Sequence, residues 1–318
     1  MVQDASGNVR GAYTLVFQCF LIGGVPEQVA FLQIPISEGS INPAYSAVGL
    51  FLLKDALRRS PLLFGLGMGG TDRPLPKLFR AFGALVREVP FLFRVVHPRA
   101  FLRNATVFRS RTLLRAASQI SANTGLGNLA FGLIHGLRSL HSVPKRNVRI
   151  ETVPAFQRSA DDIWKSDAQR YSCLSFRDSE TLNYLYPRED ARYHRLIIHE
   201  NGKLAGWALV TDSQMSDHNH FGDMRVGALA NCLAQEGHED AVVAGANYYL
   251  QDRGVDLIVS NQSHSAWIKA FRRAGYLSHR SNFVLAFSRP LTEKIKSHDP
   301  ELRRVHMNRG DGDGAYNL

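Results

Sequence analysis

Apolar and polar positions follow one order twice along the chain. The segments Val48 to Arg59 and Ala241 to Arg253 have the three-to-four-residue spacing of amphipathic helices. Each is followed by a short apolar run, Leu62 to Leu66 in the first case and Val255 to Val259 in the second, as expected for buried strands. A second helical segment and a second apolar run follow each time. The pattern therefore predicts helix, strand, helix, strand, twice over.

A shared motif lies in the second helix of each copy. Residues 77–83 and 269–275 both read Lys-x-Phe-Arg-x-x-Gly, and the apolar runs 91–93 and 283–285 each begin eight residues after the glycine. A glycine there fits a helix end, where the chain needs a residue that tolerates positive φ. We interpret the repeat as two similar domains. Basic helices ending in glycine are common, so the alternative interpretation is that the two motifs resemble each other by chance.

Alternating apolar residues also predict antiparallel strand pairs. Arg10 to Gly24 and Val29 to Ile36 are expected to pair around a glycine turn. Tyr193 to His199 and Leu204 to Thr211 are expected to pair around Asn201-Gly202, a dipeptide that suits a type I′ turn. In the first copy, the stretch from Val86 to Val96 is expected to form a closing hairpin. These elements predict mixed, mostly antiparallel sheets.

The composition is that of a globular protein. The 318 residues are 45% apolar and 21% charged, and they suffice for two domains. The three cysteines lie too far apart to indicate a disulfide framework or a zinc site, so we expect reduced thiols in the core and no metal. The first residues lack a secretory signal, and no apolar stretch reaches the ~18 residues that span a bilayer. We expect a cytoplasmic protein.

The net charge of +10 comes from one segment between the two copies. Residues 89–150 contain no acidic residue and ten basic ones: Arg94, Arg99, Arg103, Arg109, Arg111, Arg115, Arg138, Lys145, Arg146 and Arg149. Helical apolar spacing within residues 105–145 predicts a basic helical bridge. Two interpretations stay open: a packing linker with a solvated basic face, or an element that meets an anionic membrane surface, a phosphate-bearing substrate or nucleic acid.

The loop before the first helix carries a resemblance. A strand ending near Ile36 is followed by small residues that open a helix, and helix N-termini favour anions such as pyrophosphate. The loop resembles the acyl-CoA loop of the GNAT acyltransferase superfamily, Gln/Arg-x-x-Gly-x-Gly/Ala followed by a leucine-rich helix. Ala44 takes the Gln/Arg place, Ala47 the first glycine place and Gly49 the second. The resemblance implies cofactor contacts from Ala44, Ser46, Ala47, Val48 and Gly49.

The GNAT resemblance covers most of residues 11–290, in the order of elements more than in individual residues. It implies an α/β fold with two domains, each a mixed, mostly antiparallel sheet flanked by helices. We expect an N-terminally incomplete GNAT-like domain at 1–104, the basic bridge at 105–145, a second GNAT-like domain at 146–292 and a flexible tail at 293–318. The tail sequence Asp311-Gly312-Asp313-Gly314 begins like a calcium loop but lacks the further ligands. Its asparagine and aspartates are also candidates to line an acceptor pocket.

Transfer of an acyl group to an amine needs a base and a proton donor. The family often has a tyrosine four residues before the repeated glycine, as general acid to the departing thiolate, but Phe79 and Phe271 stand there. Glu38 follows the strand before the loop and is a candidate base, and Tyr45 is a candidate to replace the missing acid. His264 is another candidate, although a capping loop explains it equally well.

The expected function is transfer of an acyl group from acyl-CoA, such as acetyl-CoA, to an amine. The loop 235–240 of the second copy is acidic and unsuited to pyrophosphate, so we expect the cofactor on the first copy and the acceptor on the second. We expect the acceptor amine on a small molecule or a glycan, and a looser resemblance to Fem-type and cell-envelope polysaccharide transferases suggests an amino sugar of an envelope polysaccharide. Two alternatives remain: a Fem-like enzyme that uses aminoacyl-tRNA, and a degenerate GNAT pair that binds without catalysis.

Overall fold

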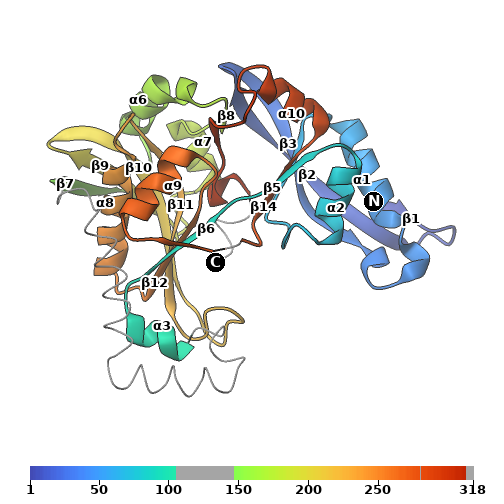
Figure 1. Ribbon diagram of the computed structural model, residues 1–318, viewed down its shortest axis with the longest axis horizontal. Coiled ribbons are helices and arrows are strands. Elements are labelled where there is room, and N and C mark those ends of the chain that lie inside the picture. Colours follow the sequence, from blue (N-terminus) through green and yellow to red (C-terminus); the bar gives the residue numbers. More distant parts are fainter. Residues whose placement is uncertain (105–146, 280, 313–318) are drawn as a thin grey trace.

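The computed structural model describes residues 1–104, 147–279 and 281–312, and two sheets flanked by helices dominate it (Figure 1). Sheet A contains, in spatial order, β15 (Val305–His306), β8 (Cys173–Ser175), β2 (Val9–Ile22), β3 (Val25–Ser37), β4 (Leu63–Leu66), β14 (Val284–Phe287) and β5 (Leu85–Glu88), with β1 (Val2–Gln3) beside β2. Sheet B contains β13 (Leu277–His279), β6 (Phe91–Val95), β12 (Leu257–Asn261), β11 (Arg225–Ala234), β10 (Lys203–Gln214), β9 (His194–Glu200) and β7 (Val148–Val153).

Most of the predicted elements are present. The α-helices in the described residues are α1 (Val48–Arg59), α2 (Pro74–Ala81), α3 (Pro98–Asn104), α6 (Arg158–Asp167), α7 (Ser179–Leu185), α8 (Glu239–Asp252), α9 (Ser265–Arg273) and α10 (Arg289–Lys296). The hairpins β2–β3 and β9–β10 pair in antiparallel register as predicted. Within each sheet one central pair is parallel, β3–β4 in sheet A and β11–β12 in sheet B. The mixed, mostly antiparallel α/β class is confirmed.

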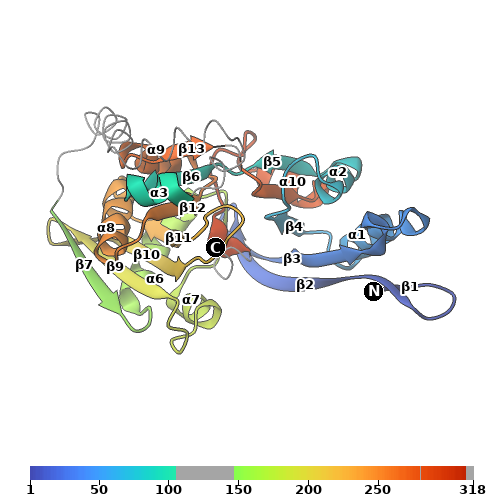
Figure 2. The same ribbon diagram turned by 90° about the horizontal axis from the view of Figure 1, so that it is seen from below.

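Each sheet buries one face under helices from its own copy of the pattern. In α1, Val48, Leu52, Leu53 and Ala56 are buried at helical spacing, and Leu53 and Ala56 pack with Leu63 and Phe79 over sheet A. Helices α8 and α9 pack in the same way on sheet B, where Trp267 and Phe271 are fully buried. Figure 2 shows α1 and α2 on one side of the long strands β2 and β3.

Each copy of the pattern contributes its last strand to the sheet of the other copy. After β5 the chain leaves sheet A, and β6 inserts into sheet B between β12 and β13. In return β14 enters sheet A between β4 and β5, where Leu285 faces Leu66 on one side and Arg87 on the other. Figure 1 shows β6 among the strands of sheet B and β14 beside β5 in sheet A. The exchanged strands are the two apolar runs that begin eight residues after the repeated glycine.

The exchange corrects the predicted hairpin from Val86 to Val96. Strands β5 and β6 lie in different sheets and do not pair with each other. The intervening residues Val89 and Pro90 carry the chain across, and the amide of Val89 donates to Phe283 O at 2.9 Å. Strands β8 and β15 also join sheet A from the second half. The residue ranges expected for two domains therefore do not coincide with the two sheets.

The predicted flexible tail is also corrected, over residues 293–312. Helix α10 buries Leu291, Thr292 and Ile295, and β15 pairs in parallel with β8. A 3₁₀ turn, η5 (Arg309–Asp311), follows and is closed by a capping box between Asn308 and Asp311. Its polar composition led to the prediction of a flexible tail, but contacts with buried residues hold the segment in place. The bridge predicted at 105–145 lies outside the described residues.

Candidate functional site

Strands β3 and β4 run together for only two residue pairs. Ala30 faces Leu63 and Phe31 faces Phe64, after which β3 continues to Ser37 without β4 as its partner. Register against β2 shifts between Ala12 and Thr14, so that β3 carries an extra residue there, and Ile34 has φ of 44°. A bulge of this kind bends a strand and ends its regular pairing. The parallel pair therefore diverges toward the loop that leads into α1.

Two short 3₁₀ turns, η1 (Glu38–Ser40) and η2 (Pro43–Tyr45), shape that loop. The Ser37 hydroxyl accepts from the amide of Gly39 at 3.2 Å, and the Asn42 side chain accepts from the amide of Ala44 at 3.1 Å. The turns fold against each other so closely that a Cβ on Gly39 would lie 2.3 Å from the Tyr45 carbonyl oxygen. Only glycine fits at position 39 without moving this backbone.

The loop delivers the chain to the N-terminus of α1. No side chain in the described part of the chain caps this end, and the first turn contains no acidic residue. The first amides of a helix lack partners inside the helix and carry partial positive charge, so this end can bind an anion. A Cβ on Gly49 would lie 3.4 Å from the nearest atom, Leu78 Cδ1, which is ordinary contact. The candidate cofactor residues 44 and 46–49 thus lead into an uncapped helix start.

Arg10 brings the two candidate catalytic residues together. Its Nη1 donates to Glu38 Oε2 at 2.8 Å, and its guanidinium carbon lies 4.3 Å from the centre of the Tyr45 ring. The same side chain donates to Asp4 at 2.7 Å, and this hydrogen bond lowers the pKa of Asp4 to about 2. The Glu38 hydrogen bond, with that of Asp4, raises the pKa of Arg10. Sequence reasoning missed Arg10, whose role depends on the β2–β3 register.

The equivalent position in sheet B is occupied by the chain itself. Strands β11 and β12 pair from Val226 to Ala228 and then diverge, with a register shift after Leu209 in β10 that leaves an extra residue in β11. Asn308 lies between the diverging strands: it bridges to Gln262, and its Nδ2 donates to Asn231 at 3.0 Å. The tail residues 307–311 therefore fill this divergence.

The start of α8 differs from that of α1, because its first turn is acidic. Glu239 and Asp240 occupy its first turn, and Glu239 is buried in a salt bridge with Arg170 at 2.8 Å. His238 Nδ1 lies 2.7 Å from Glu200 Oε2. Carboxylates at the positive end of α8 stabilise the helix and repel a further anion.

A buried polar network links the tail to the second half, and no sequence signal predicted it. Arg177 is fully buried and donates to both carboxylate oxygens of Asp311, to the Cys232 carbonyl and toward His306 Nδ1. Ser175 donates to the same Asp311 carboxylate. Gly312 follows directly, and a Cβ there would lie 3.2 Å from Leu66 Cδ2 and 3.5 Å from Phe31 Cζ. The tail thus runs from the filled divergence of sheet B to the diverging strands of sheet A.

His264, Phe79 and Phe271 lie away from the loop. His264 precedes α9, makes an edge contact with Tyr171, and has its pKa lowered to about 4, mainly by burial. Its Nδ1 is buried and makes no hydrogen bond within the described part of the chain. Phe79 and Phe271 are fully buried in the cores of the two sheets. None of the three is brought together with Glu38.

No group of three or more His, Cys, Asp and Glu side chains in residues 1–104, 147–279 and 281–312 is arranged to hold a metal ion. None of the helices in these ranges combines the length and apolar character needed to span a bilayer.

Comparison with known proteins adds a likeness of fold. No protein-family model matches the chain, and no curated protein sequence matches it. The structure is similar to Saccharomyces cerevisiae N-myristoyltransferase with bound myristoyl-CoA and inhibitors, with a TM-score of 0.51 and 8% identity over 90% of this chain and 65% of that one. A second structure, of the same enzyme with bound myristoyl-CoA, has a TM-score of 0.51 and 8% identity over 89% of this chain and 67% of that one.

This chain therefore spans about 65% of the length of the first of these enzyme structures. At 8% identity the likeness is one of fold, and it agrees with the GNAT-like architecture that the sequence suggested.

Proposed function

We propose that the protein is an N-acyltransferase that binds acyl-CoA at the diverging strands β3 and β4. One observation carries the proposal: the two copies of the pattern differ at the same place. In the first, the loop ends in an uncapped helix start without acidic residues. In the second, Glu239 and Asp240 occupy the first turn of the helix, and the tail fills the space between the diverging strands. The N-myristoyltransferase structures of similar fold contain myristoyl-CoA, which supports the choice of donor.

The reaction is transfer of the acyl group from sulfur to nitrogen. The amine nitrogen attacks the thioester carbonyl carbon, the carbon–sulfur bond breaks, and the CoA thiolate leaves and takes up a proton. The new ammonium group loses one proton to a base. We assign that base to Glu38 and the proton donor for the thiolate to Tyr45, which both lie in the loop and both contact Arg10. The amides that follow Ser46 would face the pyrophosphate.

The acceptor in this proposal is an amine on a small molecule or a glycan, including an amino sugar of an envelope polysaccharide, and the expected location is the cytoplasm. A second candidate is a protein that binds acyl-CoA without catalysis. It is favoured by Phe79 and Phe271, which are fully buried and provide no hydroxyl at the positions where the resemblance implies a tyrosine.

Calorimetric titration with acetyl-CoA and myristoyl-CoA tests the proposal. Gly49→Asp adds a carboxylate to the first turn of α1, which favours the helix but repels pyrophosphate. We expect binding to the unaltered protein and at least a tenfold loss in this variant. Gly49→Asn is the uncharged control, and Ser265→Asp places the same charge at the start of α9. Failure of both thioesters to bind would overturn the proposal, and a tRNA-binding assay would then test the aminoacyl-tRNA alternative.

A further inference from the structure

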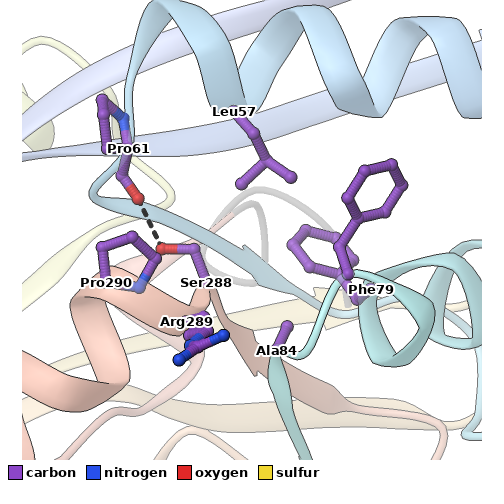
Figure 3. Close-up of a pocket in the computed structure, with 8 residues that line it drawn as sticks. Leu57, Pro61, Phe79, Ala84, Ser288, Arg289 and Pro290 are labelled. Carbon is purple, nitrogen blue, oxygen red and sulfur yellow. Dashed lines mark hydrogen bonds between the residues drawn. The ribbon is translucent and has the colours of Figure 1, made fainter.

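A pocket of about 230 Å³ lies between three elements of the sheet A region, at the end of α1 opposite the candidate loop. Its walls come from the end of α1, the end of α2 with the start of β5, and the start of α10 (Figure 3). The lining residues are Leu57, Pro61, Phe79, Phe82, Ala84, Ser288, Arg289 and Pro290. Six of these eight are apolar, so the cavity is suited to an apolar group.

Ser288 and the backbone amides beside the pocket are already hydrogen-bonded. The Ser288 hydroxyl donates to the Pro61 carbonyl at 2.6 Å and accepts from the amides of Leu63 and Leu291 (Figure 3). The amide of Ala84 donates to the Phe79 carbonyl at 3.0 Å, and that of Gly83 donates to Arg80, which closes the end of α2. Water entering the pocket would find few free partners here, and a buried water needs two to four.

Arg289 supplies one positive charge at the side of this apolar space. Its Nε donates to Glu293 at 2.7 Å in an exposed pair, and this is the one hydrogen bond that its side chain makes within the described residues. The side chain is 72% exposed, so its other donors can face a ligand that projects from the pocket. A Cβ on Gly83 would lie 3.6 Å from Arg289 Cδ, which shows that the stem of Arg289 lies along the end of α2. The N-terminus of α10 adds partial positive charge next to it.

We propose that this pocket binds a medium-chain monocarboxylate, with its hydrocarbon chain inside and its carboxylate on Arg289. An apolar cavity of about 150 Å³ holds benzene in another protein, and ~30 Å³ for each water-sized group gives room here for about eight carbon atoms. The anionic head matches both Arg289 and the helix start. The site is separate from the candidate loop and does not depend on the proposed acyl transfer.

Binding of octanoate and of octanol, measured by calorimetry at low and moderate salt, tests the assignment. We expect octanoate to bind at least fivefold more tightly than octanol, with the difference reduced by salt because it comes from a charge. In Arg289→Gln the preference for octanoate should disappear while octanol still binds. Arg303→Gln is the matched control: Arg303 is 78% exposed, pairs with Glu301 and lies outside the pocket.

Variants that fill the pocket provide a second test of the proposal. Ala84→Leu should abolish binding of both compounds and keep or raise the melting temperature, since it fills an apolar cavity. If this variant does not fold, Phe82→Trp fills the same space from the end of α2. Octanoate binding that survives in a folded, filled variant would overturn the proposal, as would equal affinity for octanoate and octanol or no binding of octanoate to the unaltered protein.

Discussion

Arg177 Nη2 lies 3.0 Å from Asp311 Oδ2, and neither side chain is more than 1% exposed. The two residues are 134 positions apart in the sequence, and their pairing fixes the tail to the second half. We predict that Asp311→Asn lowers the free energy of unfolding by about 3–5 kcal/mol, because it leaves a buried guanidinium without a counter-charge. Urea denaturation measures this loss.

Asp190→Asn is the control for that measurement. Asp190 pairs with Arg192, but the arginine side chain is 56% exposed, so the expected loss is below about 1 kcal/mol. Similar losses in the two variants would show that the buried pair has no special importance.

Leu92 tests the strand exchange. It belongs to the first half of the chain, yet it is fully buried in the core of sheet B. Leu92→Ala should cost about 2–5 kcal/mol, as expected for a large-to-small change in a core. All three tryptophans, Trp164, Trp207 and Trp267, follow residue 146, so their fluorescence reports on the second half. We expect the fluorescence transition of Leu92→Ala to shift as far as the circular dichroism transition, whereas Leu50→Ala, at a 41% exposed position, should shift neither by much.

Acid should destabilise the protein through two buried histidines. Burial lowers the pKa of His264 from its ordinary value of 6.5 to about 4, and it lowers that of His306 well below its ordinary value. The folded state therefore resists protonation, and its stability is complete above about pH 6.5 and declines as the pH falls toward 4. His264→Gln should reduce this decline. Unfolding free energies at pH 7, 5.5 and 4.5 provide the comparison, and identical slopes for the two proteins would contradict it.

The three cysteines should differ in reactivity. Cys173 and Cys232 are fully buried, as expected of core thiols, and burial raises the pKa of both. The expected core position is wrong for Cys19, which is exposed because it lies on the open face of β2. A thiol reagent should therefore label one cysteine in the native protein and three after denaturation. Desolvation also raises the pKa of Cys19, so its labelling should accelerate with rising pH. Cys19→Ser should remove the native signal.

Glu38 is the residue whose replacement tests the proposed chemistry. Once an acceptor is identified, Glu38→Gln should lower kcat by about 10²-fold or more with little change in CoA affinity, because a missing base affects the proton transfer. Glu88→Gln, in the exposed end of β5, is the control. An unchanged kcat in Glu38→Gln would show that this carboxylate only anchors Arg10.

The sequence was sufficient for much of the local structure. Asn201 and Gly202 have φ of 52° and 79°, the left-handed values that a two-residue type I′ turn requires, so the dipeptide identified its hairpin. Helix α1 begins and ends at the predicted residues, because its apolar spacing is regular and its loop is rich in small residues. These features depend on neighbours within a few positions.

The sequence does not indicate which sheet β6 and β14 join. Both are short apolar runs, and an apolar run can pair with either sheet equally well. The Arg177–Asp311 pair was missed for a related reason: nothing near either residue indicates a partner more than a hundred positions away. Arg10 was missed because its contact with Tyr45 depends on where β2 and β3 align. The features that were missed all depend on pairing between distant parts of the chain, whereas those that were predicted depend on local sequence.

The strand exchange also constrains how such a protein can evolve by recombination. A recombination event that replaced the second half with that of a relative would give sheet A a β14 selected against another β4 and β5, and would give β6 an unfamiliar place beside β12. Both cores would be damaged by a single crossover. The two halves must therefore evolve together, and substitutions in one are constrained by the strand it contributes to the other.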